Sequence, residues 1–221
     1  MNTPPDIAVK ICGLSTPETV TAAVEVGASH IGFLFFEKSP RYVTPPQAAS
    51  LRALLPPTVS AVALLVDADD ALVDNIVSEV RPDLLQCHGQ ETPDRITALK
   101  ARTGLPVMKV ISVADAADVA SARVYEQVAD LLLFDAKPPK SMANALPGGN
   151  ALSFDWSLIA NVAHTLPWML SGGLTPDNVA NAIAQTGARM VDVSSGVEDA
   201  PGKKNSALIR AFVKAAKSAV R

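Results

Sequence analysis

The sequence of 221 residues has little cysteine, no excess of positive charge and no long apolar run. Its two cysteines, Cys12 and Cys87, are too few for a disulfide framework and lack metal-binding spacing, so we expect reduced thiols and no bound metal. A formal net charge of −3 argues against nucleic acid or an anionic membrane as the main partner, because both require a clustered basic surface. No apolar run approaches the ~20 residues of a membrane-spanning helix.

The amino terminus also lacks the features of a secretory signal. Met1–Lys10 has neither a basic start nor an apolar core, so we expect a cytoplasmic protein that acts on a small molecule. The chain is 48% hydrophobic, and its length suits one large domain or two small ones. The sequence does not determine the oligomeric state, for which we favour a monomer.

Short apolar runs alternate with longer amphipathic segments along the whole chain. Continuous apolar runs are typical of strands that are covered on both faces, and strict alternation with helices indicates a parallel sheet. The predicted strands are Ile7–Leu14, His30–Phe36, Ser60–Asp67, Leu84–Gly89, Val107–Val113, Asp130–Lys137, Trp168–Gly172 and Met190–Gly196. Eight such units predict an α/β fold, a single (β/α)8 TIM barrel over residues 1–221. An open doubly wound sheet is the alternative, but no G-x-G-x-x-G motif follows the first strand.

Thr-Pro pairs and glycines mark the expected helix ends. Threonine can cap the first free N–H groups, and proline at the first helical position loses no hydrogen bond. The pairs are Thr16-Pro17, Thr44-Pro45, Thr92-Pro93 and Thr175-Pro176, and the glycines placed to end helices are Gly27, Gly104 and Gly187. The last helix is predicted from about Asn205 to Val220.

The connection after the sixth predicted strand breaks the pattern of short loops. Residues 138–153 carry Pro138-Pro139, Pro147 and Gly148-Gly149, a composition too rich in turn formers for a core segment. Long loops in compact domains are often lids over a site. A plain surface loop fits the same composition, and the sequence leaves the two interpretations open.

Chemistry in such a barrel is expected at the carboxyl ends of the strands. The residues predicted there are Cys12, Phe36, Asp67, His88, Ser112, Asp135, Ser171-Gly172-Gly173 and Ser194-Ser195-Gly196. Strand alternation places Lys10 on the same face as Cys12 and Asp192 on the same face as Ser194. Polar residues within apolar strands are therefore expected to point into the mouth of the barrel.

Two segments have the composition of a phosphate site. Gly172 and Gly173 follow the seventh strand, and Ser194, Ser195 and Gly196 end the eighth. Barrels commonly hold phosphate in these two loops, where glycine lets the backbone approach the anion and serine adds a hydroxyl donor. Tight turns also require glycine, so each cluster alone fits a plain turn equally well.

Each candidate polar residue could also have a purely structural role. A free cysteine such as Cys12 often only fills space, but near an acid it can serve as a general base once its thiolate is stabilised. Asp135 could instead cap a helix or pair with Lys137. His88 could bind substrate or satisfy backbone carbonyls, and Arg41 is either a solvated loop charge or a clamp for a carboxylate. Cys87 is predicted to pack between barrel and helices.

Motifs along nearly the whole chain resemble those of the phosphoribosylanthranilate isomerase family. These motifs are Val9-Lys10-Ile11-Cys12-Gly13-Leu14, Gly32-Phe33-Leu34-Phe35, Lys38-Ser39-Pro40-Arg41-Tyr42, Leu85-Gln86-Cys87-His88-Gly89, Phe154-Asp155-Trp156, Leu170-Ser171-Gly172-Gly173-Leu174, Val191-Asp192-Val193-Ser194-Ser195-Gly196-Val197-Glu198 and Pro201-Gly202-Lys203-Lys204. Two departures are the longer segment 138–151 and Cys87, where an aliphatic residue is expected.

The resemblance implies an Amadori rearrangement of N-(5'-phosphoribosyl)anthranilate in tryptophan biosynthesis, without metal or organic cofactor. It makes Asp135 the general acid that protonates the furanose ring oxygen and Cys12 the general base that removes the C2 proton. Arg41 would hold the anthranilate carboxylate, with the phosphate against Gly173 and the turn 194–196. Asp192 would orient groups near Cys12.

Other barrels that bind sugar phosphates are the rival interpretations. The histidine-pathway isomerase is expected to carry aspartate in place of Cys12, and indoleglycerol phosphate synthase depends on a catalytic lysine. A non-catalytic barrel that senses a metabolite could keep the phosphate loops but would not need both acid and base. The retention of Cys12 and Asp135 favours an enzyme.

Overall fold

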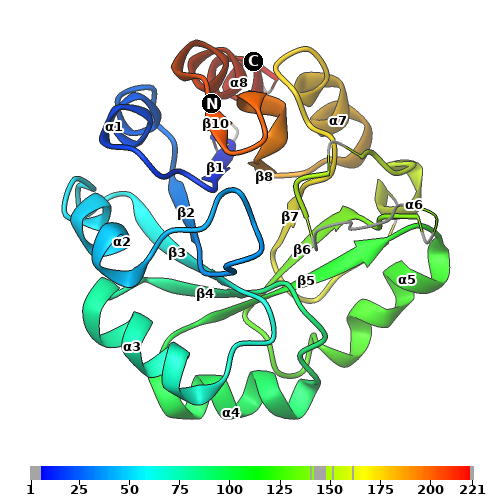
Figure 1. The fold of residues 1–221 in the computed structure, drawn as a ribbon. Helices are drawn as coiled ribbons and strands as arrows, with labels where there is room; N and C mark the ends of the chain where they lie inside the picture. The colour runs from blue at the N-terminus through cyan, green and yellow to red at the C-terminus, as the bar shows by residue number, and fades with distance from the viewer. Residues whose placement is uncertain (1–5, 140, 142–147, 151, 161, 220–221) are drawn as a thin grey trace, which may run out of the picture.

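Eight parallel strands close into a barrel, and helices surround it (Figure 1). The computed structural model describes residues 6–139, 141, 148–150, 152–160 and 162–219. The strands are β1 (Ala8–Cys12), β2 (His30–Leu34), β3 (Ser60–Leu65), β4 (Leu84–Cys87), β5 (Val107–Val113), β6 (Leu131–Ala136), β7 (Trp168–Leu170) and β8 (Met190–Val193). The barrel closes between β1 and β8, where Lys10 is in register with Asp192. The predicted TIM barrel is confirmed, and the open sheet is excluded.

The helices follow the strands in chain order. They are α1 (Pro17–Glu25), α2 (Pro45–Arg52), α3 (Asp70–Val80), α4 (Pro93–Thr103), α5 (Ala116–Ala120), α6 (Ser157–Ala160), α7 (Val179–Thr186) and α8 (Ser206–Ser218), with 3-10 turns η1 (Ser121–Val124) and η2 (Ser195–Val197). A hairpin of β9 (Glu198–Ala200) and β10 (Lys203–Lys204) lies between η2 and α8. Within the ranges that the structure describes, no helix is both long and apolar enough to cross a membrane.

Three of the four predicted threonine caps are confirmed. The hydroxyls of Thr16, Thr44 and Thr92 accept backbone N–H groups at the starts of α1, α2 and α4. The prediction for Thr175 is wrong: α7 begins at Val179, and the Thr175 backbone N–H donates to the Asn178 side chain. That hydrogen bond closes a turn before the helix, so the Thr-Pro pair lies in the turn rather than at a cap.

All three glycines predicted to end helices do so in left-handed conformations. Gly104 and Gly187 end α4 and α7. Gly27, with φ of +88°, follows the last turn of α1, where its own N–H donates to the Val24 carbonyl and the Ala28 N–H donates to the Ala23 carbonyl.

Every strand except β5 ends earlier than its apolar run predicts. The eighth strand, predicted to continue to Gly196, ends at Val193, because Ser195–Val197 turns into η2. Cys12 and Asp135 remain within β1 and β6, whereas His88, Ser171 and Ser194 lie in the loops that follow their strands.

Two apolar layers fill the molecule on either side of the strands. The inner layer consists of side chains that point into the barrel near the amino-terminal ends of the strands. They are Val62, Leu84, Met108, Val110, Leu131, Leu133 and Met169. The larger outer layer lies between strands and helices and includes Val9, Ile11, Cys87 and one face of α8. The expected packing role of Cys87 agrees with this position. Because the inner layer fills the barrel at the amino-terminal ends of the strands, the residues at the carboxyl ends can line a polar cavity.

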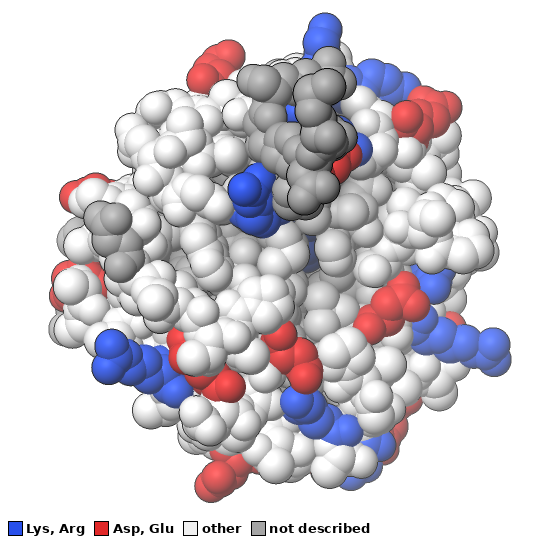
Figure 2. Space-filling model, turned by 180° about the vertical axis from the view of Figure 1, so that it is seen from behind, with Lys and Arg blue, Asp and Glu red and all other residues white. Residues whose placement is uncertain are grey.

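Figure 2 shows the face opposite to the view of Figure 1. Basic and acidic side chains alternate around its rim, and neither sign gathers into one patch there.

Candidate active site

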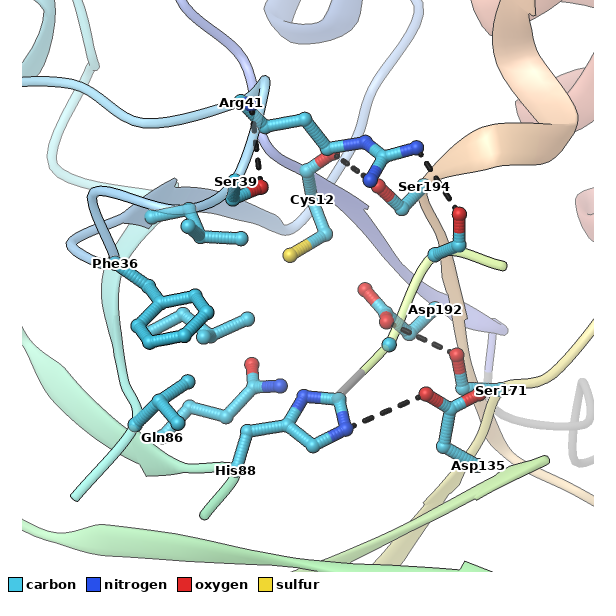
Figure 3. A pocket seen from close by; sticks show the side chains of 15 residues that line it. Cys12, Phe36, Ser39, Arg41, Gln86, His88, Asp135, Ser171, Asp192 and Ser194 are labelled. Atoms are coloured by element: carbon cyan, nitrogen blue, oxygen red, sulfur yellow. Dashed lines mark hydrogen bonds and ion pairs between the residues drawn. The ribbon is translucent and has the colours of Figure 1, made fainter. Parts of the chain in front are cut away.

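Cys12 and Asp135 line one cavity at the carboxyl ends of the strands. The Cys12 sulfur and the Asp135 carboxyl project into it from β1 and β6, and Asp192 and Ser171 lie between them (Figure 3). The empty space at this mouth, counted together with the part open to solvent, is about 470 Å³. Its lining is Cys12, Leu34, Phe36, Ser39, Arg41, Leu64, Val66, Gln86, His88, Asp135, Gly148, Gly149, Ser171, Asp192 and Ser194.

Cys12 ends β1 in a buried setting. Burial raises the pKa of the Cys12 thiol, and the neighbouring Lys10 ammonium opposes this rise. Lys10 is completely buried and donates to Asp192 Oδ1 at 2.8 Å, while Ser171 Oγ donates to Asp192 Oδ2 at 3.1 Å. Burial lowers the pKa of Lys10, but Asp192 and Cys12 together raise it to about 12. Asp192 therefore links β1, β7 and β8 directly below the thiol, as expected from strand alternation.

Asp135 is held by the backbone of the next residue and lies beside a histidine. Its Oδ1 accepts the Ala136 backbone N–H at 2.9 Å, and its Oδ2 lies 3.4 Å from His88 Nε2. The predicted alternative of an ion pair with Lys137 is wrong, because Lys137 binds Asp118 at 2.6 Å. His88 faces the acid across the cavity, so its ring is part of the site.

Arg41 is buried in an ion-pair network, and its interpretation as a solvated loop charge is wrong. Its Nε and Nη2 donate to the two oxygens of Glu198 at 2.7 and 2.8 Å, and Nη2 also donates to the Gly149 carbonyl at 3.1 Å. Lys204 reaches the same carboxylate at 2.7 Å. Arg41 therefore already makes the two parallel hydrogen bonds that suit an arginine to a carboxylate, and it makes them with Glu198.

The same network adjoins Cys12 through Ser194. Lys204 Nζ donates to the Ser194 carbonyl and hydroxyl, and the Ser194 hydroxyl donates to the Cys12 carbonyl at 3.2 Å. Burial lowers the pKa of Lys204 to about 8, even though Glu198 acts in the opposite direction. Burial raises the pKa of Glu198, but Arg41 and Lys204 reverse this and hold it below its usual value.

The two predicted phosphate segments line a second hollow that is continuous with the first. It measures about 330 Å³ and shares Asp135, Gly149, Ser171, Asp192 and Ser194 with the cavity. Gly172, Gly173, Ser195 and Gly196 all line it. The structure therefore brings together every residue that the sequence assigned to a phosphate site.

Glycine is required at two of these positions. Gly173 has φ of +65°, and a side chain there would lie 2.8 Å from the Leu152 carbonyl oxygen. A side chain at Gly196 would collide with the Leu174 carbonyl. The backbone thus approaches closely around the hollow, and small residues keep it open.

The end of the long loop after β6 lies against the site. Gly149 contacts Arg41 through its carbonyl, and a side chain at Gly148 would lie 2.5 Å from the His88 ring and 2.8 Å from Asp135 Oδ2. Residues 140, 142–147 and 151 lie outside the described residues. The choice between lid and surface loop therefore stays open.

Sequence reasoning missed several residues of the site and included others that lie elsewhere. Glu198 and Lys204 belong to a recognised motif but carry no role predicted from the sequence, and Ser39 and Gln86 have no distinguishing local signal. Asp67 and Ser112 do not line the cavity. Asp67 instead accepts the Gln90 backbone N–H at 2.7 Å, which ties together the loops after β3 and β4.

Comparisons with known proteins agree with this geometry. Residues 9–215 match the family model described as N-(5'phosphoribosyl)anthranilate (PRA) isomerase. The N-(5'-phosphoribosyl)anthranilate isomerase of Parvibaculum lavamentivorans is 58% identical over 213 residues, which cover 96% of this chain and 99% of the relative. That of Paramagnetospirillum magneticum is 56% identical over 211 residues, covering 96% and 97%.

Solved structures give the same result. The phosphoribosyl anthranilate isomerase of Thermotoga maritima has a TM-score of 0.86 at 36% identity, covering 96% of this chain and 99% of that one. A phosphoribosyl anthranilate isomerase in complex with reduced 1-(o-carboxyphenylamino)-1-deoxyribulose 5-phosphate has a TM-score of 0.82 at 34% identity, with the same coverage. By its sequence and its fold, the chain belongs to the N-(5'-phosphoribosyl)anthranilate isomerase family.

Proposed function

We propose that the cavity carries out the family's Amadori rearrangement with Asp135 as general acid and Cys12 as general base. The reaction converts N-(5'-phosphoribosyl)anthranilate to 1-(2-carboxyphenylamino)-1-deoxyribulose 5-phosphate, a step of tryptophan biosynthesis. One observation carries the assignment of roles: the thiol and the carboxyl come from different strands but line the same cavity, which continues into the Gly/Ser hollow.

The proposed mechanism has two proton transfers to or from protein groups. Asp135 gives a proton to the furanose ring oxygen, the C1–O bond breaks, and the nitrogen lone pair forms a protonated Schiff base at C1. The Cys12 thiolate then takes the proton from C2, and the C2–H electron pair moves towards the iminium nitrogen to give an enolamine. Protonation at C1 and loss of the enol proton yield the ketone. Separate groups suit the two steps because one proton is delivered and another removed.

The two ends of the cavity suit the two ends of the substrate. The Gly/Ser hollow offers the backbone and hydroxyl groups that a phosphate requires. At the other end, Leu34, Phe36, Leu64 and Val66 provide apolar surface for an aromatic ring. Arg41 lines the cavity but not the Gly/Ser hollow and would attract the anthranilate carboxylate, with Glu198 holding the guanidinium in place. One relative has been solved in complex with reduced 1-(o-carboxyphenylamino)-1-deoxyribulose 5-phosphate, a compound with a phosphate at one end and an arylamine at the other.

His88 and Asp192 are assigned supporting roles. His88 contacts the acid and would touch the sugar beside it. Asp192 holds Lys10 and Ser171 and so orients the groups around Cys12. The single domain over residues 1–221, the monomeric state, the cytoplasmic location and the absence of a cofactor stay predictions.

Two conservative substitutions test the roles of the acid and the base. Cys12→Ser and Asp135→Asn should each lower kcat by ~100- to 10,000-fold, because each removes a positioned proton-transfer group. Loss of anthranilate fluorescence measures the rate, and circular dichroism confirms that the variants fold. Cys87→Ala is the matched control, since Cys87 packs outside the barrel and should keep the normal rate. Near-normal rates in both site variants would refute the assignment.

A further inference from the structure

Lys10 is a completely buried lysine in the barrel, one step deeper than Cys12. The two residues are separated by one position on β1, so their side chains share a face. A lone buried ammonium is costly and needs a partner, which Asp192 supplies from β8 at 2.8 Å. The pair explains how the charge is tolerated. It does not explain why a charge lies directly below the thiol.

The geometry at Gly32 shows how close the ammonium comes to the sulfur. Gly32 on β2 is in register with Cys12. A Cβ placed at Gly32 would lie 2.9 Å from Cys12 Sγ and 3.2 Å from Lys10 Nζ. Both atoms therefore border the same small space, which exists because this residue has no side chain.

Several charged groups surround the thiol, and they act in different directions. Lys10 from β1 and Lys204 from β10 favour the thiolate, whereas burial and Asp192 from β8 disfavour it. The effect of Lys10 on the thiol exceeds that of Asp192. Ser171 further occupies the second oxygen of Asp192. Across the cavity lie Arg41, His88 and Asp135.

We propose that Lys10 is a positioning residue whose ammonium stabilises the Cys12 thiolate that removes the C2 proton. The inference deepens the proposed function and rests on the role given there to Cys12. In the transfer, the C2–H bond breaks and an S–H bond forms, while the electron pair moves to the iminium nitrogen. Lys10 stays protonated throughout, because its pKa is about 12, and so it is not itself the base.

The test measures ionisation of the thiol directly and needs no turnover. The rate of Cys12 alkylation by iodoacetamide is followed against pH in a Cys87→Ala background, where Cys12 is the only cysteine. Lys10→Met removes the charge but keeps the length of the side chain. It should move the midpoint of the alkylation profile upward by about one unit, and so slow alkylation about tenfold below the midpoint.

A second variant removes the lysine together with its partner. Lys10→Met leaves Asp192 unpaired and could fail to fold, so Lys10→Met/Asp192→Asn is compared with the Cys87→Ala background, in which the pair is intact. We expect the higher midpoint in the double variant, because the effect of Lys10 on the thiol exceeds that of Asp192. Equal midpoints would overturn the inference.

Lys109→Met is the matched control for losing a buried lysine. Lys109 is also almost completely buried and pairs with a carboxylate, Glu91, at 2.7 Å, but it does not line the cavity. Its loss should leave the midpoint of Cys12 unchanged; an equal shift would mean that general loosening of the barrel, not the nearby charge, moves the midpoint.

Failure of this inference and failure of the proposed function give different results. If Cys12→Ser kept its turnover while the double variant raised the midpoint, Cys12 would not be the base, but Lys10 would still stabilise its thiolate. If Cys12→Ser lost its turnover while the midpoints stayed equal, the base would stand without help from Lys10.

Discussion

At the scale of single residues, Cys12 lies where burial opposes its own ionisation. Burial raises the thiol pKa above its ordinary value of about 8.5, and the nearby ammonium groups offset only part of that rise. A general base acts in its deprotonated form. The fraction of active enzyme should therefore grow as the pH rises towards the pKa of Cys12.

Because the pKa of the Cys12 thiol is raised, we expect kcat/KM to increase towards alkaline pH. In the unaltered protein, kcat/KM should increase between about pH 7 and 9, because the thiol pKa lies above its ordinary value. Cys12→Asp replaces the thiol with a carboxylate, which is ordinarily ionised above about pH 4, and should abolish the rise. Steady-state kinetics across the pH range measures both profiles.

Lys204 titrates over the same pH range as the predicted rise, but its effect on activity should be opposite to that of the thiol. Its pKa of about 8 means that it loses charge over the same range, which removes a cation beside Ser194 and Cys12. Its titration should therefore lower activity as pH rises, opposite to the effect of the thiol. A rise that persists in Cys12→Asp would show that another group is the base.

The residues that sequence could predict differ in kind from those it missed. Strand alternation predicted that Lys10 and Cys12 share a face and that Asp192 points inward, because a strand fixes side-chain direction every two residues. Glu198 and Lys204 carry no such local signal. Glu198 reaches Arg41 across 157 positions of the chain, and Lys204 reaches Glu198 within the β9–β10 hairpin, so the contacts depend on the tertiary fold.

At the scale of elements, the loops after β7 and β8 are shaped by close backbone approaches. Gly196 in the middle of η2 lies against the Leu174 carbonyl, and both segments line the same hollow. Two loops from neighbouring strands thus form one surface. A substitution that separates them should disturb the binding of phosphate as well as the fold.

Gly196→Ala tests this packing. The added methyl group should force the two loops apart, lower the free energy of unfolding by about 1–3 kcal/mol and raise KM for the substrate. Gly104→Ala is the control, because Gly104 has φ of +68° but no neighbouring atom within 4 Å of a new Cβ. It should cost stability, seen in thermal unfolding, without changing KM. An unchanged KM in Gly196→Ala would argue against a phosphate site here.

Element boundaries were predicted less well than element types. All eight strands exist, since short apolar runs bounded by turn formers are typical of buried parallel strands. The start of α7 differs from the predicted one because another side chain binds the backbone there. The Asn178 side chain accepts the Thr175 backbone N–H and closes a turn before the helix. Between β6 and β7, the only helix among the described residues is the short α6, and sequence patterning gave no length for it.

At the scale of the whole molecule, closure of the barrel creates the site. β6, β7, β8 and β1 are consecutive neighbours in the closed sheet, although β1 and β6 lie at distant positions in the sequence. Asp135, Asp192 and Cys12 come from β6, β8 and β1, and Ser171 directly follows β7. The acid and the base thus face one cavity only when the first strand meets the last.

The central claim is that this one cavity supplies an acid and a base for two different steps, and a deuterium isotope effect tests it most directly. With substrate deuterated at C2, Cys12→Ser should show a larger isotope effect on kcat than the unaltered protein, because C2–H cleavage becomes rate-limiting. Asp135→Asn should show a suppressed effect, because ring opening then limits the rate. The reverse result, a larger effect in Asp135→Asn and none in Cys12→Ser, would contradict the assignment.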